Sequence, residues 1–587
     1  MTYCLKNTNF LHSFNAKSFS EVNPKHKSAH SSFETPDPAF WTKEGYAVLR
    51  ADEVGLGQSP GVMDTMSKGT SEAFSEVIEW AAEQPWSSGK VGLMGISYFA
   101  GSQWRVAARQ PKGLSAILPW DGMSDYYRDR CRHGGILTGF LKWWFDRQVL
   151  SNQYGLPGKE AHKWGPDTIE GDLSEEELAK NRHDQTVDNS LHFFRDDPYY
   201  GTKEYNPEDV NVPLLSVGNW GSIMIHLHGN IEGYVQASSS KKFLRMIVGR
   251  HDIPFYEDEH VEIQKSFLDA FLKGEDRGGW TDGTRPSVDL IIRRGNVGYN
   301  NPPVEQAAFK RRFENEWPIA RTNYTKYYLT PSGSLITKEP SLGVSKLSYQ
   351  ALSTIDDPSV LNFSTSPFDF PVEITGHIVA RVHVSASACL RGPVPTDVDL
   401  FLTVRHFAAD GSEVFYTGIT GEPVPLCKGW QRVSLRKVNK NHHRHREYLP
   451  YRDYFSQDVL PVIIGEVYPV DVEIWPTTVV AEKGDRIVLE ISSGDTQGCG
   501  LFGHATEERY ADLSPNPYSS YVKLVVRGSS MLADISCIGL RKGLRERIIF
   551  ILDLNISIGS FYQSFRRHDR SRTVLILWQN MKLGLPC

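Results

Sequence analysis

The chain has 587 residues, which is too long for one hydrophobic core and predicts two to four domains. Hydrophobic residues make up 40% and charged residues 23%, so the composition is that of a soluble globular protein and excludes global disorder. With 64 Lys and Arg against 70 Asp and Glu, the net charge of −6 gives no basic field that would attract nucleic acid or an anionic membrane.

Cysteine usage and the N-terminal stretch limit the compartment and the cofactors. The seven Cys are scattered singly without a CxxC pair, which argues against a zinc site and against a disulfide framework. Residues 1–28 lack the apolar core of a signal peptide, and no stretch approaches the roughly 20 apolar residues of a membrane span. We expect a cytoplasmic protein without a metal, cofactor, membrane or nucleic-acid partner, and formation of a homo-oligomer is left open.

Strands and helices alternate from residue 45 onward. Residues 45–52, 90–95 and 114–120 are short apolar runs that predict buried strands. Between them, residues 70–84 and 98–110 have apolar side chains at helical spacing. This alternation predicts βαβ units, and hence an α/β domain whose parallel sheet has helices on both faces.

The remainder of the chain changes in pattern. Aromatic and charged stretches after Gly122 predict a helical cap inserted into the sheet, and short alternating strands after a Gly-rich linker predict a β-sandwich, most simply a jelly roll. The C-terminal tail resembles neither part. We divide the chain into an atypical N-terminal segment (1–44), the α/β domain in two parts (45–121 and 210–275), the helical cap (122–209), the jelly roll (285–527) and an unassigned tail (528–587).

The stretch "KVGLMGISYFAGSQW" places Ser97 between a predicted strand and a predicted helix. A serine on such a turn exposes its hydroxyl, and the helix N-terminus offers backbone N–H groups to an oxyanion. Gly95 lies two residues before Ser97, but Phe99 lies where the simple G-x-S-x-G pattern has a second glycine. By pattern alone Ser97 is either a nucleophile or a serine in a tight structural turn. His251, at the end of a later strand, is either its general base or a packing residue.

Several separated segments together identify a family. "GYAVLRADEVGLGQSPG", "EWAAEQPWSSGKVG", "GISYFAGSQW", "SFLDAFLKGE" and "VDVEIWPTTVVAEKGDRIVLEIS" resemble the cocaine esterase and X-Pro dipeptidyl-peptidase-like (CocE/NonD) serine hydrolases. The resemblance implies an α/β-hydrolase domain, a helical cap and a C-terminal jelly roll. It also implies that Ser97 is the nucleophile, that His251 is the general base, and that the backbone N–H of Tyr98 is one oxyanion donor.

The acid of the triad departs from the family pattern, because Gly221 stands where the family has an Asp. An imidazolium needs a nearby carboxylate, so another residue has to supply it. Asp121, directly after the strand over 114–120, is the first candidate, since some α/β-hydrolases supply the acid from that edge of the sheet. Glu232 is the second candidate and Asp252, beside the histidine, is the third. For Asp121, a loop or helix-cap carboxylate is the alternative interpretation.

The N-terminal segment departs more strongly. The resemblance implies further strands upstream of residue 45 and a Tyr that completes the oxyanion hole, but residues 1–44 do not have strand patterns and Tyr3 is the only tyrosine among them. Since the third strand of this fold lies between the fourth and fifth, we expect a gap with unpaired backbone groups in the middle of the sheet. A truncated N-terminus is the simplest interpretation.

Two other features have ordinary explanations. "HHRHR" (442–446) lacks acidic or Cys ligands and is interpreted as a solvated loop rather than a metal site, and "LKWWFDR" (141–147) either lines an acyl pocket or packs as a helix.

From the serine turn and the family resemblance we predict a serine hydrolase that acts on a small-molecule ester or amide. The alternative is an impaired or truncated family member that acts as a binding protein through its jelly roll.

Overall fold

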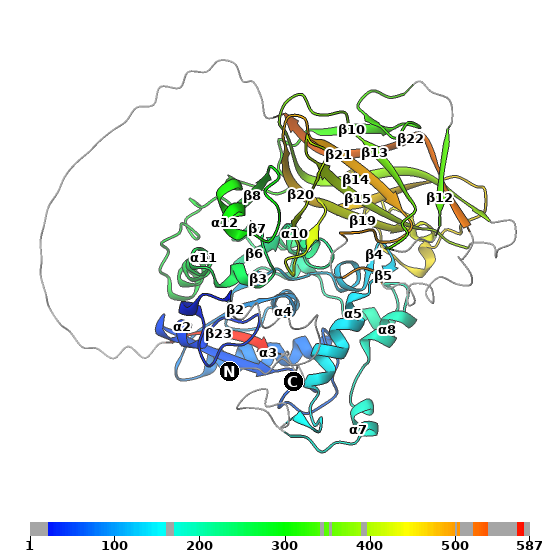
Figure 1. Ribbon diagram of the computed structural model, residues 1–587. Coiled ribbons are helices and arrows are strands. Elements are labelled where there is room, and N and C mark those ends of the chain that lie inside the picture. The colour runs from blue at the N-terminus through cyan, green and yellow to red at the C-terminus, as the bar shows by residue number, and fades with distance from the viewer. Residues whose placement is uncertain are drawn as a thin grey trace, which may run out of the picture.

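The structure is a computed structural model that describes residues 21–159, 170–340, 345–351, 355–388, 396–498, 502–504, 520–537 and 572–579. Two parts are distinct: an α/β part with a mostly parallel sheet, and a β part of antiparallel strands (Figure 1). They are joined through β8 and β20, whose ends pair in parallel.

The α/β sheet has the strand order β1-β23-β2-β3-β6-β7-β8-β9, and within it only the β8–β9 pair is antiparallel. The strands predicted over 45–52, 90–95 and 114–120 are confirmed as β1, β2 and β3. The bounds are β1 (Tyr46–Asp52), β2 (Ser87–Ile96), β3 (Leu114–Trp120), β6 (Leu214–Asn219), β7 (Lys242–Ile247), β8 (Val288–Arg294), β9 (Lys310–Glu314) and β23 (Arg572–Gln579).

The expected gap in the sheet is absent, and this corrects the sequence prediction. β23, from the tail that had no assignment, lies between β1 and β2 and is parallel to both, as the red arrow among the blue strands in Figure 1 shows. Val574 and Ile576 pack in one apolar cluster and Leu575 in the other, so both faces of β23 are buried. Strands buried on both faces are typical of the middle of a parallel sheet.

Helices cover both faces of this sheet. α3 and α4 contact β2 and share one apolar cluster with its Val91 and Leu93, and α10 contacts β6. α2 and α11 belong to the other apolar cluster, which holds Met94 and Ile96 of β2. The bounds are α2 (Pro38–Lys43), α3 (Lys68–Glu83), α4 (Tyr98–Ala107), α10 (Leu227–Gln236) and α11 (Asp258–Leu268) with the continuing turn η8 (Asp269–Lys273).

Short helical elements fill most of the described stretch between β3 and β6. α5 lies beside the α/β part, and α7 lies at the far end of this insertion from the β part (Figure 1). The elements are η3 (Tyr126–Cys131), β4 (Arg132–His133), β5 (Ile136–Leu137), α5 (Phe140–Trp144), η4 (Phe145–Val149), η5 (Leu150–Asn152), α7 (Glu175–Lys180), α8 (Gln185–Leu191), α9 (Pro198–Gly201) and η6 (Pro207–Asp209).

The β part consists of antiparallel strands in two groups. One group pairs in the order β13-β21-β15-β19; in the other, β22 pairs with β10, β12 and β14, and β14 pairs with β20. Its strand β22 extends past the predicted boundary at residue 527. The bounds are β10 (Tyr324–Leu329), β11 (Leu335–Ile336), β12 (Lys346–Gln350), β13 (Val360–Ser364), β14 (Val372–Ala388), β15 (Asp399–Phe407), β16 (Glu413–Val414), β17 (Tyr416–Thr417), β18 (Pro423–Val424), β19 (Cys427–Arg432), β20 (Tyr468–Ala481), β21 (Arg486–Ser492) and β22 (Ser520–Cys537).

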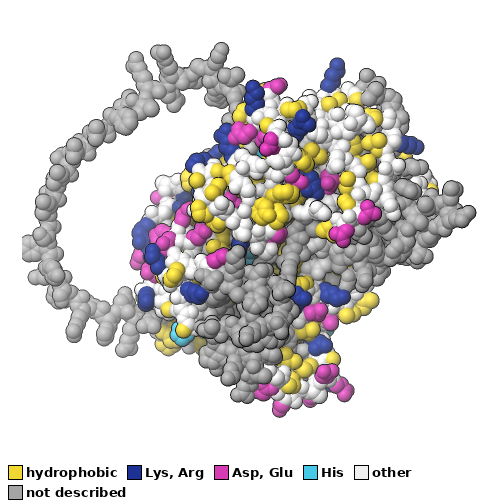
Figure 2. All heavy atoms as spheres, viewed as in Figure 1, with side chains coloured by type: hydrophobic (Ala, Val, Ile, Leu, Met, Phe, Trp, Pro, Cys, Tyr) yellow, Lys and Arg dark blue, Asp and Glu magenta, His cyan; other side chains and the backbone are white. Residues whose placement is uncertain are grey.

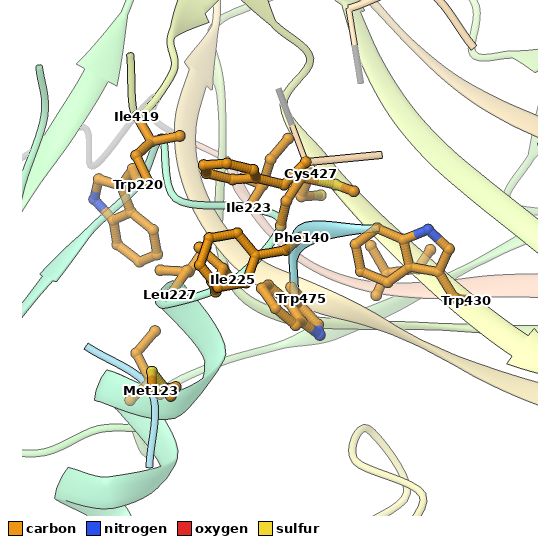
Figure 3. Close-up of a cluster of buried hydrophobic side chains, with 14 of the residues drawn as sticks. Met123, Phe140, Trp220, Ile223, Ile225, Leu227, Ile419, Cys427, Trp430 and Trp475 are labelled. Carbon is orange, nitrogen blue, oxygen red and sulfur yellow. The ribbon is translucent and has the colours of Figure 1, made fainter. Parts of the chain in front are cut away.

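An apolar cluster joins the two parts. Figure 3 shows side chains of the loop after β6 packed among those of the β part, and both sets belong to one buried core. The loop contributes Trp220, Ile223 and Ile225, the first residue of α10 contributes Leu227, and the β part contributes Ile419, Cys427, Trp430 and Trp475. The loop after β6 therefore packs against the β part as well as against the α/β part.

The surface of the protein carries charged side chains of both signs. On the face in Figure 2, basic and acidic side chains are interspersed with apolar ones. No helix in the described ranges is long and apolar enough to cross a membrane. Among the same residues no group of three or more His, Cys, Asp or Glu is placed to hold a metal ion, and in the histidine tract His442 stacks on Tyr451 while His443 pairs with Glu208.

Candidate active site

Ser97 occupies the sharp turn between β2 and α4. Its φ of 59° lies in the left-handed region, which a serine rarely adopts, and its backbone N–H donates to the carbonyls of Trp120 (3.0 Å) and Asp121 (3.1 Å). Two glycines make this turn sterically possible. A Cβ on Gly122 would lie 2.2 Å from the Cβ of Ala100, and one on Gly95 would lie 2.6 Å from the Cβ of Phe99. The side chain of Ser97 stays partly exposed at this turn.

Tyr98 begins α4, where the backbone N–H groups of the first turn have no acceptor within the helix. Its hydroxyl donates to Glu53 Oε2 at 2.8 Å and accepts from the Met66 N–H at 3.1 Å. Its ring stacks on Trp144 at a centroid distance of 5.6 Å, and the guanidinium of Arg130 lies 4.0 Å from the Trp144 ring centroid. Trp144, from the aromatic stretch 141–147, therefore packs against Tyr98, the residue directly after Ser97.

The structure brings Asp121 and His251 together. Asp121 follows β3, and its Oδ2 lies 2.8 Å from His251 Nδ1 and accepts from the Ser222 hydroxyl at 2.8 Å. The backbone N–H of His251 donates to the Ile419 carbonyl of the β part at 2.9 Å. Asp121 is fully buried, so the histidine is oriented by a carboxylate from the predicted edge of the sheet.

Glu34 contacts the other nitrogen of the same ring. Its Oε1 lies 2.8 Å from His251 Nε2, and its carbonyl accepts from the Ile96 N–H at 3.1 Å, directly beside Ser97. Burial alone lowers the pKa of His251, but the hydrogen bonds to Asp121 and Glu34 raise it to about 10. Glu34 has a left-handed φ of 61°, and such strain is concentrated at functional sites.

His226 is the imidazole that contacts the serine. Its Nε2 lies 3.3 Å from Ser97 Oγ, and its ring stacks on His251 at 5.3 Å between centroids with an interplanar angle of 15°. Burial, followed by the charges of His251 and Arg130, holds the pKa of His226 well below its usual range. No hydrogen bond joins Ser97 directly to His251 among the described residues, so the role of His251 as base stays a prediction.

The other candidate acids lie elsewhere. Glu232 Oε2 accepts from Gln236 at 2.8 Å, and Asp252 forms an ion pair with Arg250 at 3.6 Å; neither bonds to His251 in the described structure. At Gly221 a Cβ would lie 2.0 Å from the Thr417 carbonyl oxygen, so an aspartate cannot occupy this position in the present packing. Tyr3 lies outside the described residues.

Two residues of the site were missed by sequence reasoning. Glu34 lies in a segment without strand or helix pattern, and no local signal directs it toward His251. His226 had a usable signal, because it follows β6 at the sheet edge where Ser97 and Asp121 also lie. Ligand and catalytic groups in open α/β sheets gather at that edge.

Comparisons with known proteins give matches over most of the chain. The chain matches the X-Pro dipeptidyl-peptidase (S15 family) over residues 11–252 and the X-Pro dipeptidyl-peptidase C-terminal non-catalytic domain over residues 279–515. Cocaine esterase from a Rhodococcus strain is 25% identical over 535 residues, covering 78% of this chain and 81% of that protein. Xaa-Pro dipeptidyl-peptidase from Streptococcus pneumoniae is 23% identical over 246 residues, covering 37% of this chain and 31% of that protein.

A solved structure has the same fold. The crystal structure of a CocE/NonD family hydrolase from Staphylococcus aureus aligns with a TM-score of 0.73 and 24% identity, covering 91% of this chain and 87% of that chain. The α/β sheet, the serine turn and the appended β part thus define a serine hydrolase. The chain belongs to the CocE/NonD and X-Pro dipeptidyl-peptidase (S15) family, with that family's C-terminal domain, which confirms the resemblance found in the sequence.

Proposed function

We propose that the protein hydrolyses carboxylic esters or amides of small molecules through an acyl-enzyme on Ser97. The observation that carries this proposal is the strained, partly exposed Ser97 with a buried imidazole nitrogen 3.3 Å from its hydroxyl. Ser97 Oγ attacks the carbonyl carbon and the Tyr98 N–H stabilises the resulting oxyanion. Water then hydrolyses the acyl-enzyme.

Asp121 and His251 form the charged pair of this proposed site. Their 2.8 Å hydrogen bond supports Asp121 as the carboxylate that orients the histidine and stabilises its charge. For His251 to take the proton of Ser97 itself, its Nε2 has to exchange Glu34 for the serine hydroxyl. Both esters and Xaa-Pro amides are within the proposed substrate class, because the relatives' names cover both.

Activity-based labelling tests the assignment of Ser97. A fluorophosphonate probe should label the wild-type protein, and Ser97→Ala should abolish the labelling. Ser102→Ala is the matched control, since Ser102 lies on the same helix with its hydroxyl bonded to the Phe99 carbonyl, and it should be labelled like the wild type. Unchanged labelling of Ser97→Ala would contradict the proposal.

A second candidate function is a hydrolase-derived binding protein that recognises its partner through the β part. The occupation of both His251 nitrogens by carboxylates favours it, because a histidine held in this way has no free lone pair for a serine. A folded wild-type protein that no fluorophosphonate labels would support this second function. A screen of esters of different acyl length and of Xaa-Pro amides then separates the substrate classes if labelling occurs.

A further inference from the structure

Arg130, on η3, is a buried arginine close to the serine turn. It is 1% exposed, and its guanidinium carbon lies 5.6 Å from the ring centroid of Tyr98, the residue directly after Ser97. Its charge also contributes to the low pKa of His226, whose Nε2 lies 3.3 Å from Ser97 Oγ. The guanidinium therefore belongs to the surroundings of the nucleophile.

The guanidinium of Arg130 has no counter-ion in the described part of the chain. No ion pair joins it to a described residue, and its Nε and Nη2 are buried without a hydrogen-bond partner. A guanidinium carries five N–H donors and keeps its charge at every physiological pH. Because a buried charge without a partner is costly, a site that keeps one is suited to an anionic ligand.

The carboxylates adjoining Arg130 and Tyr98 have other partners. Asp129, the preceding residue in the chain, has its Oδ1 2.5 Å from His228 Nδ1. Glu53 accepts from the Tyr98 hydroxyl, and burial raises the pKa of this carboxyl to about 7. Neither carboxylate therefore serves as the counter-ion of the guanidinium.

Aromatic rings surround the guanidinium instead. Its carbon lies 4.0 Å from the ring centroid of Trp144 and 5.8 Å from those of Phe140 and Tyr126. Such rings attract the charge through their faces, but they do not replace the hydrogen-bond acceptors that the N–H groups require. In these apolar surroundings a hydrogen-bonded pair between the guanidinium and a carboxylate is stronger than in water.

We propose that Arg130 binds a carboxylate group of the substrate, so that the protein acts on esters or amides that carry a second, ionised carboxyl group. This inference rests on the proposed serine hydrolase function and names its substrate class. The two oxygens of a carboxylate match the fork of a guanidinium with parallel N–H···O bonds, which orients the substrate relative to Ser97. A neutral substrate leaves the guanidinium unpaired, so Arg130 is a specificity-determining residue.

Matched esters test the inference on the wild-type protein. The 4-nitrophenyl half-esters of dicarboxylic acids of increasing length are compared with the monocarboxylic esters of the same length, which release the same chromophore. Acetates of 4-hydroxybenzoic acid and of its amide place the same contrast in the leaving group. In one of these series kcat/KM should be at least about tenfold higher for the anionic ester, as for other hydrogen bonds to charged groups. Equal rates for every pair would overturn the inference.

Replacement of the arginine provides the second arm. Arg130→Met keeps a long side chain and removes the charge, so kcat/KM for the preferred anionic ester should fall at least about tenfold more than for its neutral partner. Arg147→Met is the matched control, because Arg147 lies 5.4 Å from the ring centroid of Trp143 and is exposed. Both rates of this control should stay within about twofold of the wild type.

Urea unfolding separates recognition from a structural role of Arg130. Without substrate, Arg130→Met should be at least as stable as the wild type, because it removes a buried charge that has no counter-ion. A loss of stability together with equal losses for both esters would overturn the inference, and if the variant does not fold, the wild-type ester series decides. Absence of any hydrolysis that depends on Ser97 would instead overturn the serine hydrolase function itself.

Discussion

The serine turn and the groups that surround it are built in different ways. The turn is one continuous stretch, from β2 through Ser97 into α4, and its geometry depends on neighbours such as Gly95 and Phe99. The groups around Ser97 come from four separate places. These are the N-terminal segment (Glu34), the end of β3 (Asp121), the loop after β6 (His226) and the loop after β7 (His251). The nucleophile is therefore specified by one local stretch, whereas its surroundings depend on the packing of four distant segments.

The turn is nevertheless not wholly local, because β2 depends on a neighbour from the far end of the chain. β23 pairs with β2 from Ser87 to Leu93, and its side chain Val574 is fully buried. Val574→Asp should place an unpaired charge inside the sheet, lower the stability by more than about 3 kcal/mol and abolish labelling. Urea unfolding followed by tryptophan fluorescence and circular dichroism measures the loss.

An exposed valine provides the control for this largest effect. Val62→Asp makes the same change at a side chain that is 47% exposed and should alter stability by less than about 0.5 kcal/mol. If the two variants unfold at the same urea concentration, β23 does not lie between β1 and β2, and the serine turn does not depend on this distant strand.

The second prediction tests the partners instead of the turn. Asp121→Asn should reduce turnover by about 100-fold or more, because it removes the negative charge from the group that orients and stabilises the histidines. Steady-state ester hydrolysis measures the effect. Glu232→Gln is the control and should stay within about twofold, since Glu232 bonds to Gln236 and not to His251. Equal losses in the two variants would remove Asp121 from the site.

The same contrast explains what the sequence could predict. β2, α4 and the turn between them follow from apolar spacing and from Gly95, so a short window predicts them, whereas the role of Ser97 as nucleophile follows only from the family resemblance. The pairing of Asp121 with His251 was predicted because both lie at the carboxyl edge of the sheet. Glu34 could not be predicted, because it reaches His251 through long-range packing and its own segment has no periodicity. The segment of β23 does have the apolar run of a buried strand, but its place between β1 and β2 depends on long-range pairing that the run does not specify.

The third prediction addresses steric fit behind the turn. Gly122→Ala adds a methyl group 2.2 Å from the Ala100 Cβ and 2.7 Å from the Ser97 carbonyl oxygen, so the turn has to shift. We expect a loss of about 1–3 kcal/mol in urea unfolding, with slower labelling. Gly201→Ala is the control, since a Cβ there meets nothing within 4 Å. A Gly122→Ala variant that labels like the wild type would show that the turn accommodates the shift.

The smallest effect is expected at Tyr98, where side chain and backbone have separate roles. The hydroxyl bonds to Glu53 and to the Met66 N–H, whereas the backbone N–H at the start of α4 is the proposed oxyanion donor. Tyr98→Phe removes the hydrogen bonds of the hydroxyl and keeps the backbone N–H. The labelling rate should therefore fall less than about tenfold, well below the 100-fold or greater loss typical of a missing oxyanion donor.

A structural tyrosine makes the Tyr98 result interpretable. The Tyr127 hydroxyl donates to the Phe193 carbonyl at 2.8 Å, so Tyr127→Phe removes a partly buried hydrogen bond that involves neither Ser97 nor Tyr98. The two variants should lose similar stability in urea unfolding, and the labelling rate should fall only in Tyr98→Phe. A loss of 100-fold or more in Tyr98→Phe would instead mean that the hydroxyl itself acts on the reacting atoms, and the serine turn would then supply a second catalytic group from the same continuous stretch.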